Sequence, residues 1–149
     1  MDLLSKLNLI LSVSINFYFE DIEEFQLDLP KSINWINNTI KKEDKITGEI
    51  SFILCSDDYL LDINRQYLDH NYYTDIITFD YVENGIISGD IFISVDRVKE
   101  NASEYEVSFQ NELNRIVIHG VLHLLGYKDK EADQKKQMTS KEDYYLRDY

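Results

Sequence analysis

Four segments of the chain carry the apolar pattern of strands. Their apolar positions alternate with polar ones or form short continuous runs rich in β-branched and aromatic residues, as half-buried and buried strands do. The dipeptide Asn84-Gly85 between the last two is typical of a tight hairpin turn, so we expect those two strands to pair antiparallel. The four predicted strands are residues 12–19, 49–55, 76–81 and 86–95.

Five other segments repeat their apolar residues at helical spacing. Pro30 opens the first, Ser56 and Ser108 are the predicted N-caps of the second and fourth, and Asp96 is the predicted cap of the third. The fifth is mostly polar and is expected to pack through Met138. The five predicted helices are residues 30–44, 57–68, 96–106, 109–125 and 131–146.

The order of these elements predicts an α+β fold, with a small mixed β-sheet of about four strands packed with about five helices and the histidine-bearing helix central. At 149 residues, 44% hydrophobic and 13% aromatic, the chain is expected to form a single domain over residues 1–149. The one cysteine, Cys55, permits no internal disulfide. The start of the chain lacks a cationic leader, and no apolar run is long enough for a membrane span, so we expect a cytoplasmic protein with no membrane partner.

The segment 119–129, HGVLHLLGYKD, carries the candidate chemistry. His119 and His123 are four residues apart on an apolar predicted helix, so they lie on one face and can reach one metal ion. Gly126 can end the helix and turn the chain back, and Asp129 then offers a carboxylate. This is the spacing of zinc hydrolases whose helix supplies two ligands and whose following turn supplies the third, so we predict Zn²⁺ held by His119, His123 and Asp129. Three protein ligands leave a fourth position for water, which is the pattern of a catalytic site.

Other interpretations of the same residues stay open. A histidine on an apolar helix face is usually a hydrogen-bonded core residue, and two such residues would then need separate partners. Asp129 could simply face solvent in the turn, and Asp133 is a more distant rival ligand. Gly120 stands where HExxH proteases carry the glutamate that acts as general base. The metal-binding spacing is therefore present, and the protease's base is absent.

The formal net charge of −13 gives no support for a nucleic-acid substrate. Nucleic-acid binders normally carry a basic patch, because neutralising phosphates supplies much of their affinity. Here the acidic residues are spread over the chain and the cations form no run. A bound divalent cation would add local positive charge that this count omits.

Residues 119–127 closely resemble the signature HGxLHLxGYDH of the YbeY family, bacterial metal-dependent endoribonucleases that act in ribosomal RNA maturation. They match every fixed position of the signature up to Tyr127, and its final Asp-His pair is replaced by Lys128-Asp129. Two further blocks are similar to those of the family and stand in the family's order. They are NRQYLDHNYYTDIITF at 64–79 and GDIFIS at 89–94.

The resemblance also implies candidates for a substrate pocket and one departure from the family. The family has an arginine where this chain has Leu68, and a leucine cannot clamp a phosphate. Arg65, about one helical turn earlier, is a possible replacement. His70 could contact a phosphate or simply lie exposed in a loop. Thr74 and Asp75 are expected to orient the cleft, although Asp75 could instead bond to nearby backbone N–H groups.

The resemblance implies a zinc-dependent endoribonuclease that acts on single-stranded RNA, with ribosomal RNA as substrate and the ribosome or a ribosomal protein as partner. Beyond the metal and its water, it identifies no catalytic residue. An alternative is a ribosome-associated assembly factor with a structural metal and little turnover, which Leu68 and the acidic charge favour. A third interpretation, a metalloprotease or other zinc hydrolase, conflicts with Gly120.

Overall fold

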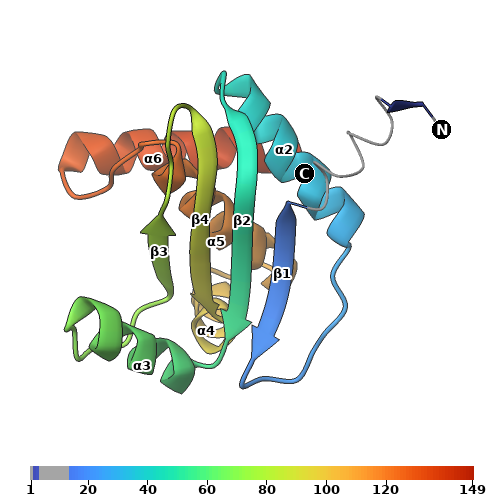
Figure 1. Cartoon of the computed structure of the whole chain (residues 1–149). Coiled ribbons are helices and arrows are strands. Elements are labelled where there is room, and N and C mark those ends of the chain that lie inside the picture. The colour runs from blue at the N-terminus through green and yellow to red at the C-terminus, as the bar shows by residue number, and fades with distance from the viewer. Residues whose placement is uncertain (1, 4–13) are drawn as a thin grey trace.

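The structure is a computed structural model that describes residues 2–3 and 14–149. Within these residues, four strands form one sheet, namely β1 (Ile15–Glu20), β2 (Ile46–Cys55), β3 (Ile76–Asp80) and β4 (Ile86–Ser94). Their order across the sheet is β1-β2-β4-β3 (Figure 1). β2 pairs parallel with β1 and β4, and β3 pairs antiparallel with β4 at the edge. The sheet is therefore mixed, as predicted.

The described residues also form five helices, so the α+β class and the element order are confirmed. The predicted hairpin is present too. Asn84 and Gly85 have φ angles of 55° and 75°, and the N–H of Ile86 donates to the carbonyl of Glu83 at 2.9 Å, as in a type I′ turn. The helices are α2 (Leu29–Lys42), α3 (Asp57–Leu68), α4 (Val95–Glu104), α5 (Phe109–Leu124) and α6 (Ala132–Leu146).

Several element boundaries differ from the sequence predictions by one to three residues, and β2, for example, already begins at Ile46. The cap of α4 is Ser94, whose hydroxyl accepts from the N–H of Arg97 at 3.2 Å, so the prediction of Asp96 was wrong. The reason is that β4 runs directly into α4, which places Asp96 in the first turn, where its carboxylate accepts from the N–H of Asp57 at 2.8 Å. The first strand begins at Ile15, and the predicted strand residues 12 and 13 lie outside the described residues.

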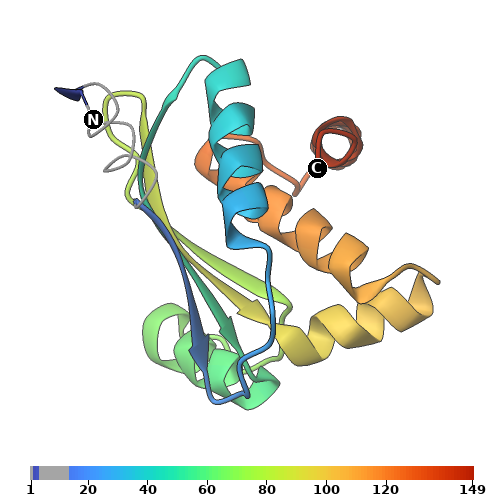
Figure 2. The ribbon, with the colours of Figure 1, turned by 90° about the vertical axis from the view of Figure 1, so that its right-hand side faces the viewer.

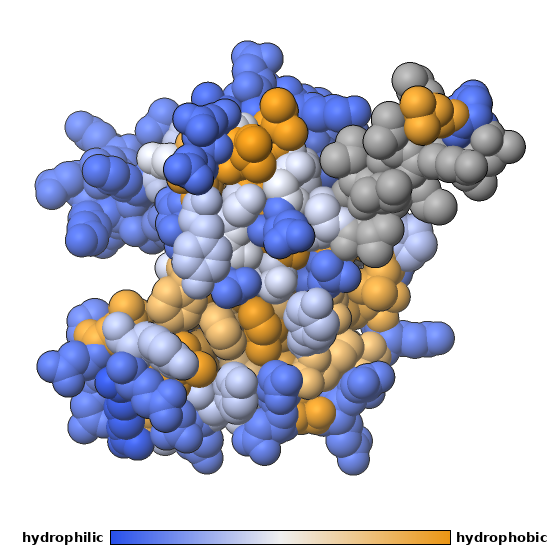
Figure 3. Space-filling view, in the orientation of Figure 1, coloured by the Kyte–Doolittle hydropathy of each residue, from blue (hydrophilic) through white to orange (hydrophobic). Residues whose placement is uncertain are grey.

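The helices cover the two faces of the sheet unequally. Figure 2 shows α2, α4 and α5 on one face with α6 beyond α5, while α3 covers only the lower part of the other face. The main core lies on the α5 side and includes Trp35, Phe52 and Leu122. A smaller apolar cluster with Cys55 lies under α3, and Figure 3 shows apolar side chains gathered over this lower part of the exposed sheet face. Burial raises the pKa of the Cys55 thiol to about 12, so this cysteine acts as a packing residue and not as a nucleophile.

Two glycines allow α5 to lie very close to the sheet. A β-carbon added at Gly120 would lie 2.9 Å from the side chain of Ile91 on β4. One added at Gly89 would lie 2.5 Å from the carbonyl of Phe79 and 2.8 Å from the side chain of Leu124. The position of α5 is thus fixed by close packing at both contact points. None of the described helices has the length and apolar character needed to cross a membrane.

Candidate metal centre

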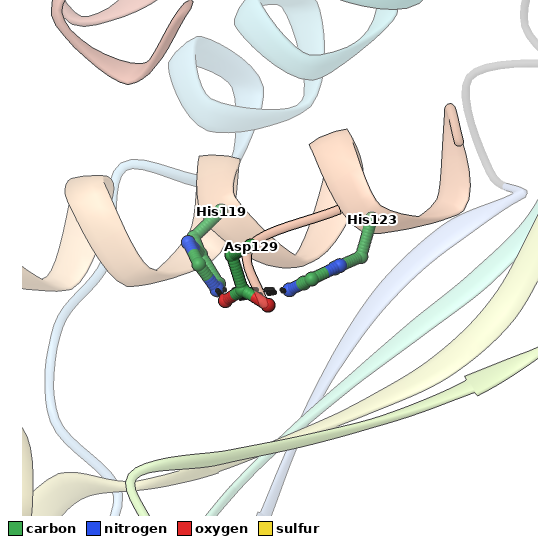
Figure 4. Close-up of side chains that lie close together, drawn as sticks. All are labelled: His119, His123 and Asp129. Atoms are coloured by element: carbon green, nitrogen blue, oxygen red, sulfur yellow. Dashed lines mark hydrogen bonds and ion pairs between the residues drawn. The ribbon is translucent and has the colours of Figure 1, made fainter. Parts of the chain in front are cut away.

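The side chains of His119, His123 and Asp129 meet on one side of α5 (Figure 4). The two Nε2 atoms lie 3.0 Å apart, and Oδ2 of Asp129 lies 3.3 Å from each of them. All three groups are partly buried, and their candidate ligand atoms lie within 4.8 Å of one another. The i, i+4 spacing puts the two rings on one helix face, as the sequence predicted.

The turn after α5 brings Asp129 back to the histidines. The N–H of Tyr127 donates to the carbonyl of Leu122 and that of Gly126 donates to the carbonyl of His123, both at 3.0 Å. This is the Schellman arrangement of a helix end, and it needs a residue with positive φ after the cap. Gly126 supplies it with φ of 102°. The predicted role of Gly126 is therefore confirmed.

The outward nitrogen of each ring has its own acceptor. Nδ1 of His119 lies 2.7 Å from Oε2 of Glu142, and Nδ1 of His123 lies 3.0 Å from the backbone carbonyl of Tyr127. A carboxylate and a carbonyl can only accept, so each Nδ1 carries a proton, and a ring in its neutral form keeps a lone pair on Nε2. Two such lone pairs and a carboxylate oxygen at these distances repel one another, and a cation between them removes the repulsion. The residues present therefore fit a metal ion.

Glu142 is a site residue that the sequence analysis missed. Only 4% of it is exposed, yet it carries a carboxylate that also pairs with Arg115 at 3.3 Å. Arg115 makes a second, short contact with buried Glu112, and these contacts raise the pKa of the guanidinium. The signal that could have identified Glu142 is its position between Met138 and Tyr145 on the apolar face of α6, where an acid is out of place unless it has partners.

A second, partly buried carboxylate supports the turn through Tyr127. Glu43, just after α2, accepts from the hydroxyls of Tyr127 and Tyr145 and from the ammonium of Lys141 at 3.2 Å. Burial raises the pKa of the Glu43 carboxyl, but the three donors outweigh burial, and the net pKa is lower than the ordinary value. Tyr127 is therefore held through its side chain while its carbonyl faces His123.

The histidines and Asp129 open into a cleft of about 460 Å³ at the β3 edge of the sheet. Thr74 and Asp75, both predicted pocket residues, line this cleft together with Thr78 and Asp80. Figure 3 shows a notch at this edge, between the start of α6 above and α3 below.

The other two predicted pocket residues do not line the cleft. Arg65 on α3 donates to the side chain of Asn71 at 2.6 Å, and His70 in the following loop stacks on Tyr72 with ring centroids 5.1 Å apart. Both side chains are exposed. A role for Arg65 and His70 in substrate binding therefore stays a prediction.

Comparison with known proteins agrees with this geometry. A family model described as Endoribonuclease YbeY matches residues 15–149. A relative from Cytophaga hutchinsonii, named Endoribonuclease YbeY, is 50% identical over 132 residues, which cover 87% of this chain and 92% of that protein. One of the same name from Flavobacterium psychrophilum is 52% identical over 115 residues, which cover 77% and 82%. A solution structure of a Thermotoga maritima protein matches with a TM-score of 0.65 at 30% identity and covers 89% of this chain and 86% of that one. The chain belongs to the YbeY family of endoribonucleases.

Proposed function

We propose that this chain is a zinc-dependent endoribonuclease that cleaves single-stranded RNA and acts in ribosomal RNA processing, with the ribosome or a ribosomal protein as partner. The observation that carries the proposal is the convergence of two imidazole nitrogens and the Asp129 carboxylate at a cleft. Two nitrogen donors and one oxygen donor suit zinc, and three protein ligands leave a position for catalysis. The link to ribosomal RNA and the ribosome comes from the family resemblance.

The chain's own residues prepare the site for this chemistry. Bound zinc would supply Lewis-acid polarisation of a phosphoryl oxygen and a lowered pKa for a coordinated water. Glu142 and the carbonyl of Tyr127 hold the rings with their Nε2 atoms directed towards the Asp129 carboxylate. Asp75 and Asp80 on the opposite wall can accept hydrogen bonds from ribose hydroxyls or base amino groups, but as anions they repel phosphate.

Exposed aromatic side chains on the chain segment that leads into the cleft favour an unpaired substrate. Tyr67, Tyr72 and Tyr73 are 65%, 56% and 47% exposed, and Tyr73 directly precedes the cleft residue Thr74. Unpaired bases stack on exposed aromatic rings, whereas the bases of a duplex are already stacked and paired. This supports single-stranded RNA as the substrate class.

Two other functions are less well supported. An assembly factor with a structural metal is favoured by Leu68 and by the net charge of −13, but a structural zinc site normally has four protein ligands. A protease would need a general base next to His119. At Gly120, however, even a β-carbon would contact Ile91 at 2.9 Å, so a glutamate does not fit there.

Zinc content and RNA cleavage, measured together, test the proposal. We expect close to one zinc per chain and cleavage of single-stranded RNA by the wild type, loss of both in His123→Ala, and reduction of both in Asp129→Asn. The matched control is Asp133→Asn. Asp133 is an exposed acid near the same turn, and it lies outside the ligand triangle formed by His119, His123 and Asp129.

Each alternative predicts a different outcome of these measurements. Equal cleavage by wild type and His123→Ala would point to a contaminating ribonuclease and overturn the proposal. Stoichiometric zinc without cleavage would favour the assembly factor. Zinc-dependent digestion of casein would favour the protease.

A further inference from the structure

A second hollow adjoins His119 and Asp129 between α5 and α6. It has a volume of about 270 Å³ and shares His119 and Asp129 with the cleft. Its other walls come from α5 and α6, including Arg115, Lys135 and Glu142. The two hollows therefore meet at the ligand triangle, and one extended ligand can occupy both.

The two hollows differ in charge, because the hollow between α5 and α6 holds two cations beside the carboxylates of Asp129 and Glu142, whereas the cleft holds carboxylates alone. The cleft on the β3 side carries Asp75 and Asp80 and no cation among its lining residues. The hollow between α5 and α6 carries two cations, but Arg115 is paired with Glu112 and Glu142. Lys135 is exposed, and its ammonium group forms no ion pair within the part of the chain that the structure describes. Lys135 is thus the charge that remains for a ligand.

We propose that the hollow between α5 and α6 is a binding subsite for an RNA phosphate next to the one that is cleaved, and that Lys135 is its phosphate contact. This inference rests on the proposed endoribonuclease function. Successive phosphates of a strand are one nucleotide apart, so a strand whose scissile phosphate lies at the triangle extends into a hollow on either side. Lys135 attracts a phosphate, whereas the acidic cleft repels one. We therefore place the neighbouring phosphate in the hollow between α5 and α6 and not in the cleft.

The subsite also accounts for how an acidic protein can hold a polyanion. With a net charge of −13, the long-range electrostatic field of the protein repels RNA. A cation beside the reactive centre offsets part of this repulsion locally. Figure 3 shows hydrophilic side chains over the start of α6, at the upper rim of the notch, and Lys135 belongs to the first turns of this helix.

Binding of a labelled, unstructured RNA to the zinc-loaded protein at several salt concentrations tests the subsite, measured by rapid mixing before cleavage proceeds, with a gel of quenched samples to confirm that the RNA is still intact. We expect Lys135→Ala to weaken binding several-fold and to lower the magnitude of the slope of log K against log salt by about 0.7, the value for one phosphate contact on a single strand. Lys135→Arg should restore the slope. The matched control is Lys136→Ala, which removes the same charge from the same helix at a residue that does not line the hollow.

A second measurement identifies the phosphate. Neutral methylphosphonate linkages are placed one at a time along the RNA, and binding is measured with wild type and with Lys135→Ala. We expect one linkage next to the cleaved one to weaken wild-type binding and to have no further effect on Lys135→Ala, because the two changes remove the same contact.

The inference and the proposed function fail in different ways. Wild type that binds and cleaves RNA, combined with a Lys135→Ala slope equal to that of wild type or of Lys136→Ala, overturns the subsite alone. Wild type that neither binds nor cleaves RNA overturns the proposed function, and the subsite with it.

Discussion

His119 and His123 leave the same face of α5, yet they are held by supports of different origin. Nδ1 of His119 contacts the carboxylate of Glu142, a buried side chain 23 residues away on another helix. Nδ1 of His123 contacts the backbone carbonyl of Tyr127, four residues away in the turn. One support is a side chain whose position depends on how α6 packs, and the other is a backbone group of the turn that ends α5.

Because of this difference, a substitution can remove the support of His119 but not the support of His123. The Tyr127 carbonyl is present whichever residue occupies that position, as long as the chain turns in the same way. The Glu142 carboxylate is removed by one substitution, and Arg115 would then lose one of its two carboxylates. We therefore expect the metal affinity to respond to side-chain changes on α6 much more strongly than to side-chain changes at Tyr127.

The largest effect, on zinc content, is expected when the imidazole rings are removed, because the candidate nitrogen ligands are then lost. His119→Ala and His123→Ala should each reduce zinc content after dialysis from about one per chain to near zero, measured by elemental analysis. The third histidine is the control. His70→Ala should retain its zinc, because the His70 ring stacks on Tyr72 outside the triangle. Equal zinc loss in all three variants would mean that zinc binds elsewhere.

The two supports are distinguished by Glu142→Gln and Tyr127→Phe. Glu142→Gln should lower zinc affinity by about 10-fold to 100-fold, as loss of a carboxylate behind a ligating imidazole does. Tyr127→Phe keeps the carbonyl and should leave zinc affinity nearly unchanged.

Competition titration with a chelator measures both affinities. Nitrogen NMR reports whether the His119 ring still carries its proton on Nδ1, a readout that general loss of stability would not change. Asp143→Asn, at an exposed acid next to Glu142, is the control. Equal losses of affinity in Glu142→Gln and Tyr127→Phe would contradict the distinction between the two supports.

A smaller effect, on the stability of the fold, is expected at Gly120. This glycine lets α5, the helix that bears both rings, lie close to the sheet. Gly120→Ala forces a β-carbon against Ile91 and should destabilise the fold by about 1–3 kcal/mol, measured by urea unfolding. Gly126→Ala provides the contrast, because a β-carbon there has nothing within 4 Å and the cost is the positive φ alone, about 1–2 kcal/mol. A Gly120→Ala variant as stable as wild type would show that α5 can shift on the sheet.

The smallest effect, on the free energy of unfolding, is expected at Glu43, which holds the Tyr127 side chain, and it depends on pH. Because the pKa of Glu43 is lowered by folding, its ionised form stabilises the protein at neutral pH, and this contribution is lost as pH falls below 4.5 through the lowered pKa. Glu43→Gln should cost about 1 kcal/mol at pH 7. The difference from wild type should shrink in acid, and a difference that is independent of pH would exclude this role for the charge.

Sequence reasoning could predict that His119, His123 and Asp129 meet, because their geometry is local. Two residues four apart on a helix, a glycine at the helix end and an acid three residues later are all determined within 11 residues of chain. The same holds for the Asn84-Gly85 hairpin, because the turn is determined by two residues that readily adopt a positive φ. The four strands and five helices also followed from apolar spacing.

The supports behind the triangle could not be predicted in the same way, because they depend on packing between distant elements. Glu142 is one acid among several on α6, and only the docking of α6 against α5 brings it to His119. Glu43 reaches Tyr127 across 84 residues of sequence. The mistaken cap at Asp96 has a related cause, since the pattern could not show that β4 continues into α4 without a loop.

The close approach of α5 to β4 at Gly89 and Gly120 has a consequence for how an ion would leave the site. Because α5 is packed closely on the sheet, its backbone amides around the two rings should exchange with deuterium only when the fold opens as a whole. Asp129 lies in the short connection between α5 and α6, whose amides should exchange through local opening. Release of an ion should therefore begin with withdrawal of the aspartate, and its residence time should follow the fluctuations of this connection and not the lifetime of the native state.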